Sequence, residues 1–110
     1  ATQQSPDNAI STMHPNYSQA IAPNIDPDSA VRSSPFTEQG QTYWHTTQLE
    51  PATISCYEHA TRTSDGHVST DVWYHTININ DPAHGTLNDG WIWGGNVNTP
   101  HDPPAGLPEC

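Results

Sequence analysis

The side chains that could do chemistry in this chain are histidines, carboxylates and two cysteines. Three of the seven histidines recur at intervals of eight residues, with carboxylates between them. Imidazole and carboxylate groups are ligands for zinc and copper, so this group is a candidate metal site. Its spacing matches neither H-x-x-x-H nor H-E-x-x-H, and histidines in polar strands are mostly surface residues. We therefore predict no metal or cofactor. A metal-binding secreted protein is kept as an alternative hypothesis, after the two given at the end of this section. The residues concerned are His59, His67 and His75, with Glu58, Asp65 and Asp71.

The sequence offers little support for catalysis. It holds no G-x-S-x-G nucleophile motif, and its two cysteines are expected to be bonded to each other, which removes a thiol nucleophile. Carboxylates are plentiful, but a glycosidase needs two at a fixed separation, which a sequence does not show. We therefore predict that the protein is not an enzyme.

Cys56 and Cys110 are the only cysteines, and Cys110 is the last residue. An even count in a small chain with few apolar residues predicts one disulfide, which is typical of secreted proteins. The bridge would close a loop of about 55 residues and stabilise the fold by roughly 4 kcal/mol. The chain starts with Ala1, as expected after removal of a secretion signal, and no apolar stretch approaches membrane-spanning length. We expect a secreted, extracellular protein.

The charge of the chain limits its partners. Arg32 and Arg62 are the only fixed cations, against twelve carboxylates, and the formal net charge is -10. Binding to nucleic acid or to an anionic membrane needs clustered Lys and Arg, so both are excluded as partners. The acidity favours a cationic partner, although high charge is also a common means of keeping a small protein soluble.

The aromatic residues favour recognition. Trp91 and Trp93 lie two residues apart in "DGWIWGGNVNTP", residues 89 to 100, so in a strand their side chains point to one face. Either both indoles point inward with Ile92 outside, or Ile92 fills the core and the indoles form an exposed platform. Such a platform usually indicates binding. A small barrel has little room for two indoles side by side, but the sequence leaves both arrangements open.

The elements that position these side chains are expected to be short strands. Only 32% of the 110 residues are apolar, which allows one domain with a modest core. Thr, Val, Ile, Tyr and Trp favour strands, and eleven prolines disfavour long helices. Residues 1–28 are polar and interrupted by prolines, so we predict an irregular N-terminal arm or linker there. Four apolar residues in this arm have the spacing of one face of an amphipathic helix, although Pro15 lies among them and disfavours that helix. They are Ile10, Met13, Tyr17 and Ile21.

Residues 29–110 are predicted to form the folded domain. "ATISCYEHAT" is the clearest strand, with Ile54 and Cys56 on one face. The pair Asp65-Gly66 predicts a turn into "DVWYHTIN". In that second strand, Val72, Tyr74 and Thr76 are expected on the face opposite Trp73, His75 and Ile77.

The remaining segments are expected to be loops and one further strand. "DPAHGTLNDG" is expected to be a long loop, and Gly94-Gly95 allows a sharp bend such as a single 3₁₀ turn. The end of the sequence, "PHDPPAGLPEC", is predicted to form an extended, proline-rich segment, which we call the strap. Four to five short strands separated by turn signals predict an all-β fold, a small barrel.

The order of these pieces resembles the bacterial SH3-like (SH3b) domain, of the small secreted actinobacterial type. The matching pieces are "AVRSSP", the strand pair around Cys56, "DVWYHT" and "DGWIWGGNVNT". That family has a V-R-x-x-P opening and a later G-W-V/I strand that leads into a short turn. The resemblance covers roughly residues 29–110 and implies a small SH3-like barrel. Two departures are Ser34, where the family often has Gly, and the long loop after Tyr74, which would alter any groove that it borders.

The resemblance implies a non-enzymatic binding module that holds an extended peptide in an aromatic groove. The ligand would be a cell-envelope peptide, such as a peptidoglycan stem peptide, or another extracellular protein. The candidate wall residues are Trp73, Tyr74, Trp91, Trp93 and Tyr57. The proline-rich strap, tied down by the disulfide, could fill this groove instead, which would make the domain structural. The other hypotheses are a protease inhibitor and a self-assembling structural subunit, a homo-oligomer formed through residues 1–28.

Overall fold

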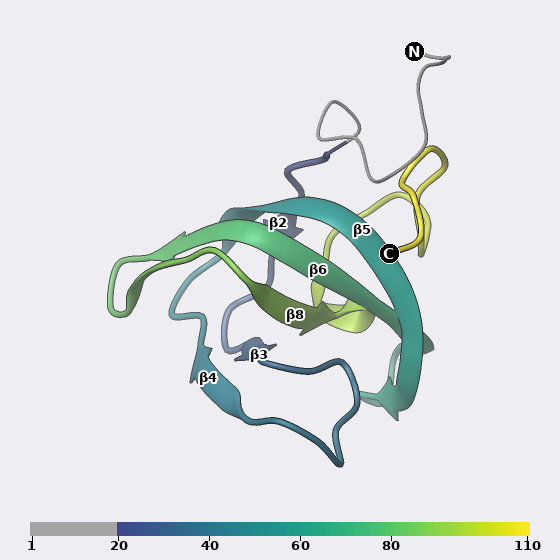
Figure 1. The fold of residues 1–110 in the computed structure, drawn as a ribbon, viewed down its shortest axis with the longest axis horizontal. Coiled ribbons are helices and arrows are strands. Elements are labelled where there is room, and N and C mark those ends of the chain that lie inside the picture. The colour runs from purple at the N-terminus through teal and green to yellow at the C-terminus, as the bar shows by residue number, and fades with distance from the viewer. Residues whose placement is uncertain (1–19) are drawn as a thin grey trace.

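The computed structural model describes residues 20–110 and is built mainly from strands (Figure 1). The strands join in one sheet, in the order β2-β5-β6-β8-β3-β4, with β7 paired to β6. The sheet curls into a half-barrel, and residues 20–110 contain no α-helix. The prediction of an all-β small barrel is confirmed. The strands are β2 Asn24–Ile25, β3 Ala30–Arg32, β4 Thr42–His45, β5 Glu50–Ser64, β6 Ser69–Asp81, β7 Gly85–Leu87 and β8 Gly90–Trp93.

The long hairpin of β5 and β6 forms the middle of the sheet. The predicted turn at Asp65-Gly66 joins the two strands: Gly66 has a φ of 92°, and Oδ1 of Asp65 accepts the main-chain N–H groups of His67 and Val68. Register shifts then interrupt the pairing at three places along β5. Such bulges bend a strand and increase its twist, so the sheet curls around one of its faces.

The apolar core lies on one face of this sheet. Val72, Tyr74 and Thr76 point into it from β6, as their alternation predicted, and Ile92 joins them from β8. Ile79 returns to the same face because Ile77 is the extra residue of a bulge. The buried members of the core are Ile25, Val31, Ala52, Ile54, Val72, Tyr74, Ile79, Ile92, Val97 and Leu107.

A bulge at Ser55 overturns the alternation expected in β5. Ile54 is opposite Thr76 and packs in the core, whereas Cys56 is opposite His75 on the other face. These two residues were predicted to share a face. One extra residue moves every later side chain to the opposite face, and nothing in "ATISCYEHAT" marks where that residue lies.

Part of the predicted arm belongs to the folded body. Ile21 bridges to Ile54, β2 pairs with the start of β5, and Ile25 is fully buried. The body therefore begins before the predicted boundary at residue 29, because β2 and Ile25 cover one end of the core. The rest of the arm, with the helical face from Ile10 to Tyr17, lies outside the described residues. The hypothesis of a subunit that assembles through the arm stays a prediction.

Two further segments follow β6. The expected long loop is a hairpin, because β7 pairs with the end of β6 from Ile79 opposite Leu87 to Asp81 opposite Gly85. The sharp bend predicted after β8 is confirmed: Gly94–Asn96 form a 3₁₀ turn, η2, and Val97 then enters the core.

The proline-rich strap lies along β5 (Figure 1, yellow). Tyr57 donates its main-chain N–H to the carbonyl of Pro108 over 3.1 Å, and Cys110 donates to the carbonyl of Tyr57 over 2.8 Å. Leu107 is buried in the core. The predicted disulfide is confirmed and joins Cys56 to Cys110 across a sequence separation of 54. The strap thus covers the edge of β5 and part of the core.

Candidate functional site

A single row of side chains crosses five strands on the face opposite the core, which we call the outer face. The pairing register aligns the row from β5 through β6, β8 and β3 to β4. Its members are Cys56, His75, Trp91, Arg32 and Thr42. Directly opposite residues in an antiparallel sheet share a face, so these side chains are neighbours, and we call them the outer row.

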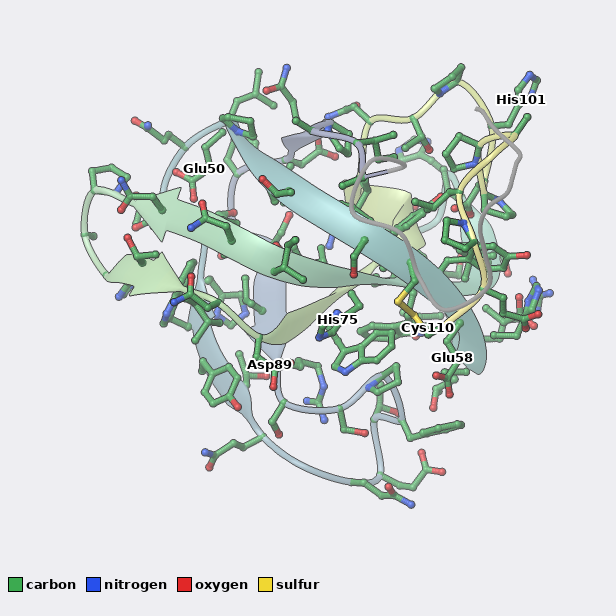
Figure 2. All side chains as sticks on the ribbon, turned by 45° about the horizontal axis from the view of Figure 1, so that its top comes forward. Glu50, Glu58, His75, Asp89, His101 and Cys110 are labelled. Carbon is green, nitrogen blue, oxygen red and sulfur yellow. A yellow bond between two sulfur atoms is a disulfide. The ribbon has the colours of Figure 1, made fainter. Side chains whose placement is uncertain are left out.

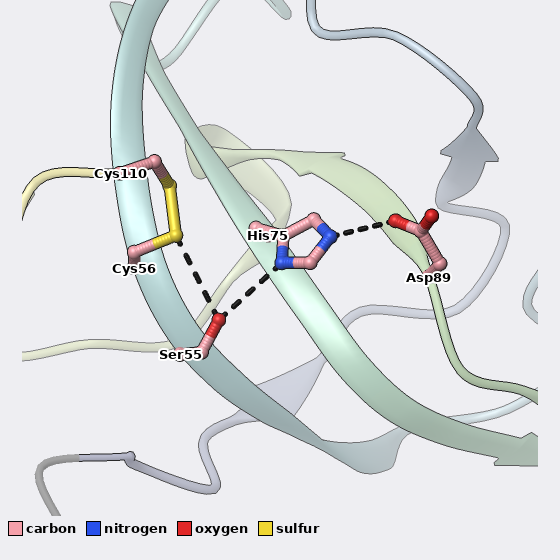
Figure 3. Close-up of a disulfide and its surroundings, with 5 residues drawn as sticks. All are labelled: Ser55, Cys56, His75, Asp89 and Cys110. Carbon is pink, nitrogen blue, oxygen red and sulfur yellow. Dashed lines mark hydrogen bonds and ion pairs between the residues drawn. A yellow bond between two sulfur atoms is a disulfide. The ribbon is translucent and has the colours of Figure 1, made fainter. Parts of the chain in front are cut away.

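His75 is the centre of a hydrogen-bond chain in the outer row (Figure 3). Its Nε2 lies 2.7 Å from Oδ1 of Asp89, and the two side chains point toward one another (Figures 2 and 3). On the other side of the ring, Nδ1 lies 3.3 Å from the Ser55 hydroxyl. That hydroxyl donates to Sγ of Cys56 over 3.7 Å. A serine, a histidine and an aspartate are therefore connected in one chain that ends at the disulfide.

This chain differs from the catalytic triad of a hydrolase. In such a triad the serine contacts Nε2 of the histidine and the aspartate contacts Nδ1, whereas here the two nitrogens have exchanged partners. Ser55 is only 5% exposed, so its hydroxyl offers little access to a substrate carbonyl. The Asp89 side chain is 84% exposed, so water competes for its carboxylate. The arrangement is suited to holding the His75 ring and to contacting sulfur.

Trp91 is the partly exposed tryptophan of the outer row. Its ring lies against that of His75, with the centroids 5.0 Å apart and the planes tilted by 55°. Ile92 fills the core, as one of the two predicted arrangements required, but the indoles of Trp91 and Trp93 do not form a shared exposed platform, because Trp93 is buried.

Arg32 holds the loop of residues 33–41. Its Nε donates to the carbonyl of Ser34, and its Nη2 donates to the carbonyl of Gln39 over 2.6 Å. The loop also reaches the far end of β5, where Thr61 donates its main-chain N–H to the carbonyl of Pro35. The loop therefore crosses the outer face from β3 to β5.

Trp73 and Trp93 form a second, small core on the outer face. They lie opposite each other on β6 and β8, and they are 3% and 6% exposed. The indole N–H of Trp73 donates to the carbonyl of Thr61 over 2.8 Å, and that of Trp93 donates to the carbonyl of Thr70 over 3.0 Å. Because both rings are buried and their N–H groups are satisfied internally, they offer little surface to a ligand.

Tyr74 and Tyr57 lie on the core side, away from Trp73, Trp91 and Trp93. Tyr74 is fully buried, and its hydroxyl donates to Oδ1 of Asp102 over 2.6 Å. Burial, and then the contact with Asp102, raises the pKa of Tyr74 well above its usual range. Tyr57 is half-buried beneath the strap, with its ring edge-on to that of His59. The structure therefore does not gather the predicted wall residues into one groove.

The histidines singled out in the sequence lie in separate places. Nδ1 of His59 lies 2.9 Å from Oδ1 of Asp71, and this hydrogen bond raises the pKa of His59 and lowers that of Asp71. His75 pairs with Asp89, and His67 is in the turn between β5 and β6. Within residues 20–110, no three His, Cys, Asp or Glu side chains are grouped so that they could hold a metal ion.

A buried carboxyl pair was missed by the sequence analysis. Asp81 accepts the main-chain N–H of Thr47 over 2.9 Å and that of Ala83 over 3.0 Å. Burial opposes the ionisation of Asp81, but these N–H groups and the contact with Glu50 outweigh it and lower its pKa to about 2. Glu50 is 3% exposed, and its own burial, followed by the contact with Asp81, raises its pKa to about 7. No local sequence signal connects the two residues, because the end of β6 meets the start of β5 only in the folded hairpin.

No protein-family model, no curated protein and no solved structure matches the chain. The resemblance to bacterial SH3-like domains therefore stays a prediction. The outer row is interpreted below from its own geometry and chemistry.

Proposed function

We propose that the protein is a secreted, non-enzymatic binding module. Its ligand is an extended extracellular peptide, from the cell envelope or from another protein, and it binds across the outer row. The observation that supports this most directly is the half-buried indole of Trp91, held against His75 in the middle of a five-strand row. A fixed aromatic ring offers a large apolar contact area and loses little side-chain freedom on binding.

The charge of the protein favours a basic ligand. The chain has a formal net charge of -10, and its two arginines are occupied: Arg32 bonds to the loop 33–41, and Arg62 donates to Ser69. Asp89 is largely exposed and is connected to Trp91 through His75. A Lys or Arg side chain of the ligand could therefore contact the Trp91 ring face and the Asp89 carboxylate together.

The Cys56–Cys110 disulfide supports the extracellular location, because such bonds persist in oxidising compartments. In the described part of the chain there is no helix with the length and apolarity needed to cross a membrane.

The proposal is tested by binding measurements with the intact protein. The probes are purified peptidoglycan and two synthetic extended peptides of equal length, one carrying lysines and one carrying glutamates in the same positions. We expect binding to peptidoglycan or to the basic peptide, and at least about tenfold weaker binding by Trp91→Ala. Tyr43→Ala is the matched control, because Tyr43 is an exposed aromatic residue on β4 outside the outer row.

Two outcomes contradict the proposal. One is that neither peptidoglycan nor the basic peptide binds the unmodified protein. The other is that Trp91→Ala binds as tightly as Tyr43→Ala, in which case the ligand does not contact the outer row.

A further inference from the structure

The two sulfurs of the disulfide have different surroundings. Cys110 is an exposed residue of the strap, whereas Cys56 is 6% exposed and lies inside β5. An incoming thiolate attacks the sulfur that it can reach, and the other sulfur becomes the leaving group. Access therefore directs attack to Cys110 and makes Cys56 the leaving thiolate.

The leaving sulfur, Cys56, is the one that carries hydrogen-bonding support. The Ser55 hydroxyl donates to it over 3.7 Å, and a thiolate is a stronger acceptor than a disulfide sulfur. With the hydroxyl hydrogen directed to sulfur, the oxygen of Ser55 faces Nδ1 of His75, 3.3 Å away. A His75 ring protonated on both nitrogens then donates to Ser55 on one side and to Asp89 on the other, 2.7 Å away.

We propose that Cys110 is a site of thiol–disulfide exchange with low-molecular-weight thiols, and that the chain Ser55–His75–Asp89 stabilises the departing Cys56 thiolate. This inference does not depend on the proposed binding function. It accounts for the contact of the Ser55 hydroxyl with the disulfide sulfur, which the binding function leaves unexplained.

The step is balanced without any further oxidant or reductant. The sulfur of the incoming thiol forms a bond with Sγ of Cys110, and the Cys56–Cys110 bond breaks with its electron pair on Sγ of Cys56. The proton of the incoming thiol passes through solvent to His75. One disulfide is exchanged for another, so the product is a chain with a mixed disulfide at Cys110 and a thiolate at Cys56.

The exchange is expected to leave the fold in place. Leu107 remains buried in the core, and Tyr74 still donates to Asp102 in the strap. The bonds that then hold the chain end to β5 are the two main-chain hydrogen bonds of Tyr57, with Pro108 and Cys110. Modification of Cys110 would therefore loosen the last residues of the strap and open the edge of β5 at Tyr57.

The test uses the oxidised full chain and reduced glutathione as the probe. After acid quenching, peptide mapping by mass spectrometry locates the mixed disulfide, and the time course gives the exchange rate. We expect glutathione on Cys110, and exchange about tenfold slower in Ser55→Ala and several-fold slower in Asp89→Asn. His67→Gln, in the exposed turn, is the control and should exchange at the unmodified rate.

A second measurement separates thiolate stabilisation from a change in access. In Cys110→Ala the absorbance of the thiolate reports the pKa of Cys56, which we expect to rise when His75→Gln or Ser55→Ala is added. The proposal is overturned by glutathione on Cys56, or by equal exchange rates in the unmodified protein, Ser55→Ala and Asp89→Asn. Asp89 is exposed, so Asp89→Asn decides the question even if Ser55→Ala does not fold.

Discussion

Glu50 and Asp81 place two buried carboxyl groups in contact where β5 begins and β6 ends. Asp81 has its own N–H donors, but no N–H or O–H group of the described residues donates to either carboxylate oxygen of Glu50. Burial without a hydrogen-bond donor disfavours the ionised form of Glu50, and the neighbouring charge of Asp81 disfavours it further. The fold therefore favours a protonated Glu50 beside an ionised Asp81.

Stability should fall as the pH rises from about 5 to about 8. The pKa of Glu50 is about 7 in the folded protein, against an ordinary value of 4.5, so between these values the folded protein binds a proton that the unfolded chain has released. The lowered pKa of Asp81 acts in the opposite direction. The stabilisation that ionised Asp81 gives to the folded protein is lost only as the pH falls below 3.8, the ordinary pKa of an aspartate. Urea unfolding across this range measures the free energy of unfolding directly.

Glu50→Gln isolates this effect, because the side-chain amide stays uncharged at every pH. We expect the variant to match the unmodified protein at pH 5 and to exceed its free energy of unfolding by about 1–3 kcal/mol at pH 8. Glu58→Gln, at a partly exposed glutamate of the same strand, should leave the pH dependence unchanged. An equal pH dependence in Glu50→Gln and the unmodified protein would contradict the assignment.

Trp73 and Trp91 should differ sharply in their contribution to stability. Trp73→Ala removes a buried indole and leaves a cavity, so we expect the free energy of unfolding to fall by about 3–5 kcal/mol. Trp91→Ala truncates a partly exposed ring and should cost less than half of that. Urea unfolding of the two variants measures the difference. Equal losses would show that Trp91 belongs to the second core and is not available for recognition.

Arg32→Lys should loosen the loop 33–41 without unfolding the protein. A lysine ammonium does not reproduce the separate guanidinium bonds to Ser34 and Gln39, so we expect a loss of about 1–2 kcal/mol. Acrylamide should quench the tryptophan fluorescence of this variant more strongly, because the loop crosses the outer face. Arg62→Lys is the matched control, since the Arg62 guanidinium donates to Ser69 at an exposed site, away from the loop 33–41. If acrylamide quenches the fluorescence of both variants equally, Arg32 does not hold the loop 33–41 over the tryptophans.

Tyr74→Phe tests how the strap is anchored. The variant keeps the buried ring but removes the hydroxyl that donates to Asp102, so we expect a loss of about 1–2 kcal/mol. Limited proteolysis should then cut the strap near Asp102 more readily. Tyr43→Phe, at an exposed tyrosine, should change neither quantity. An unchanged cleavage rate in Tyr74→Phe would mean that the disulfide and Leu107 suffice to hold the strap.

Local features were predictable wherever neighbouring residues determine the conformation. Asp65-Gly66 predicts its turn because glycine tolerates a positive φ and the aspartate side chain caps the turn. Gly94-Gly95 predicts the bend at η2, and the alternation in β6 predicts which side chains enter the core. The two cysteines predict their own bridge, since no other partner exists in the chain.

The candidate site was only partly predictable. Trp91 could be identified from its type, but which of the tryptophans are buried is decided by tertiary packing, which the local sequence does not determine. The bulge at Ser55 moves Cys56 to the face of His75 and thereby creates the chain that reaches Asp89. Pairing of distant strands brings Glu50 to Asp81 in the same way. Sequence alone determined the strands, turns and disulfide through short-range conformational preferences; tertiary structure decided the register, and the register decides which side chains become neighbours.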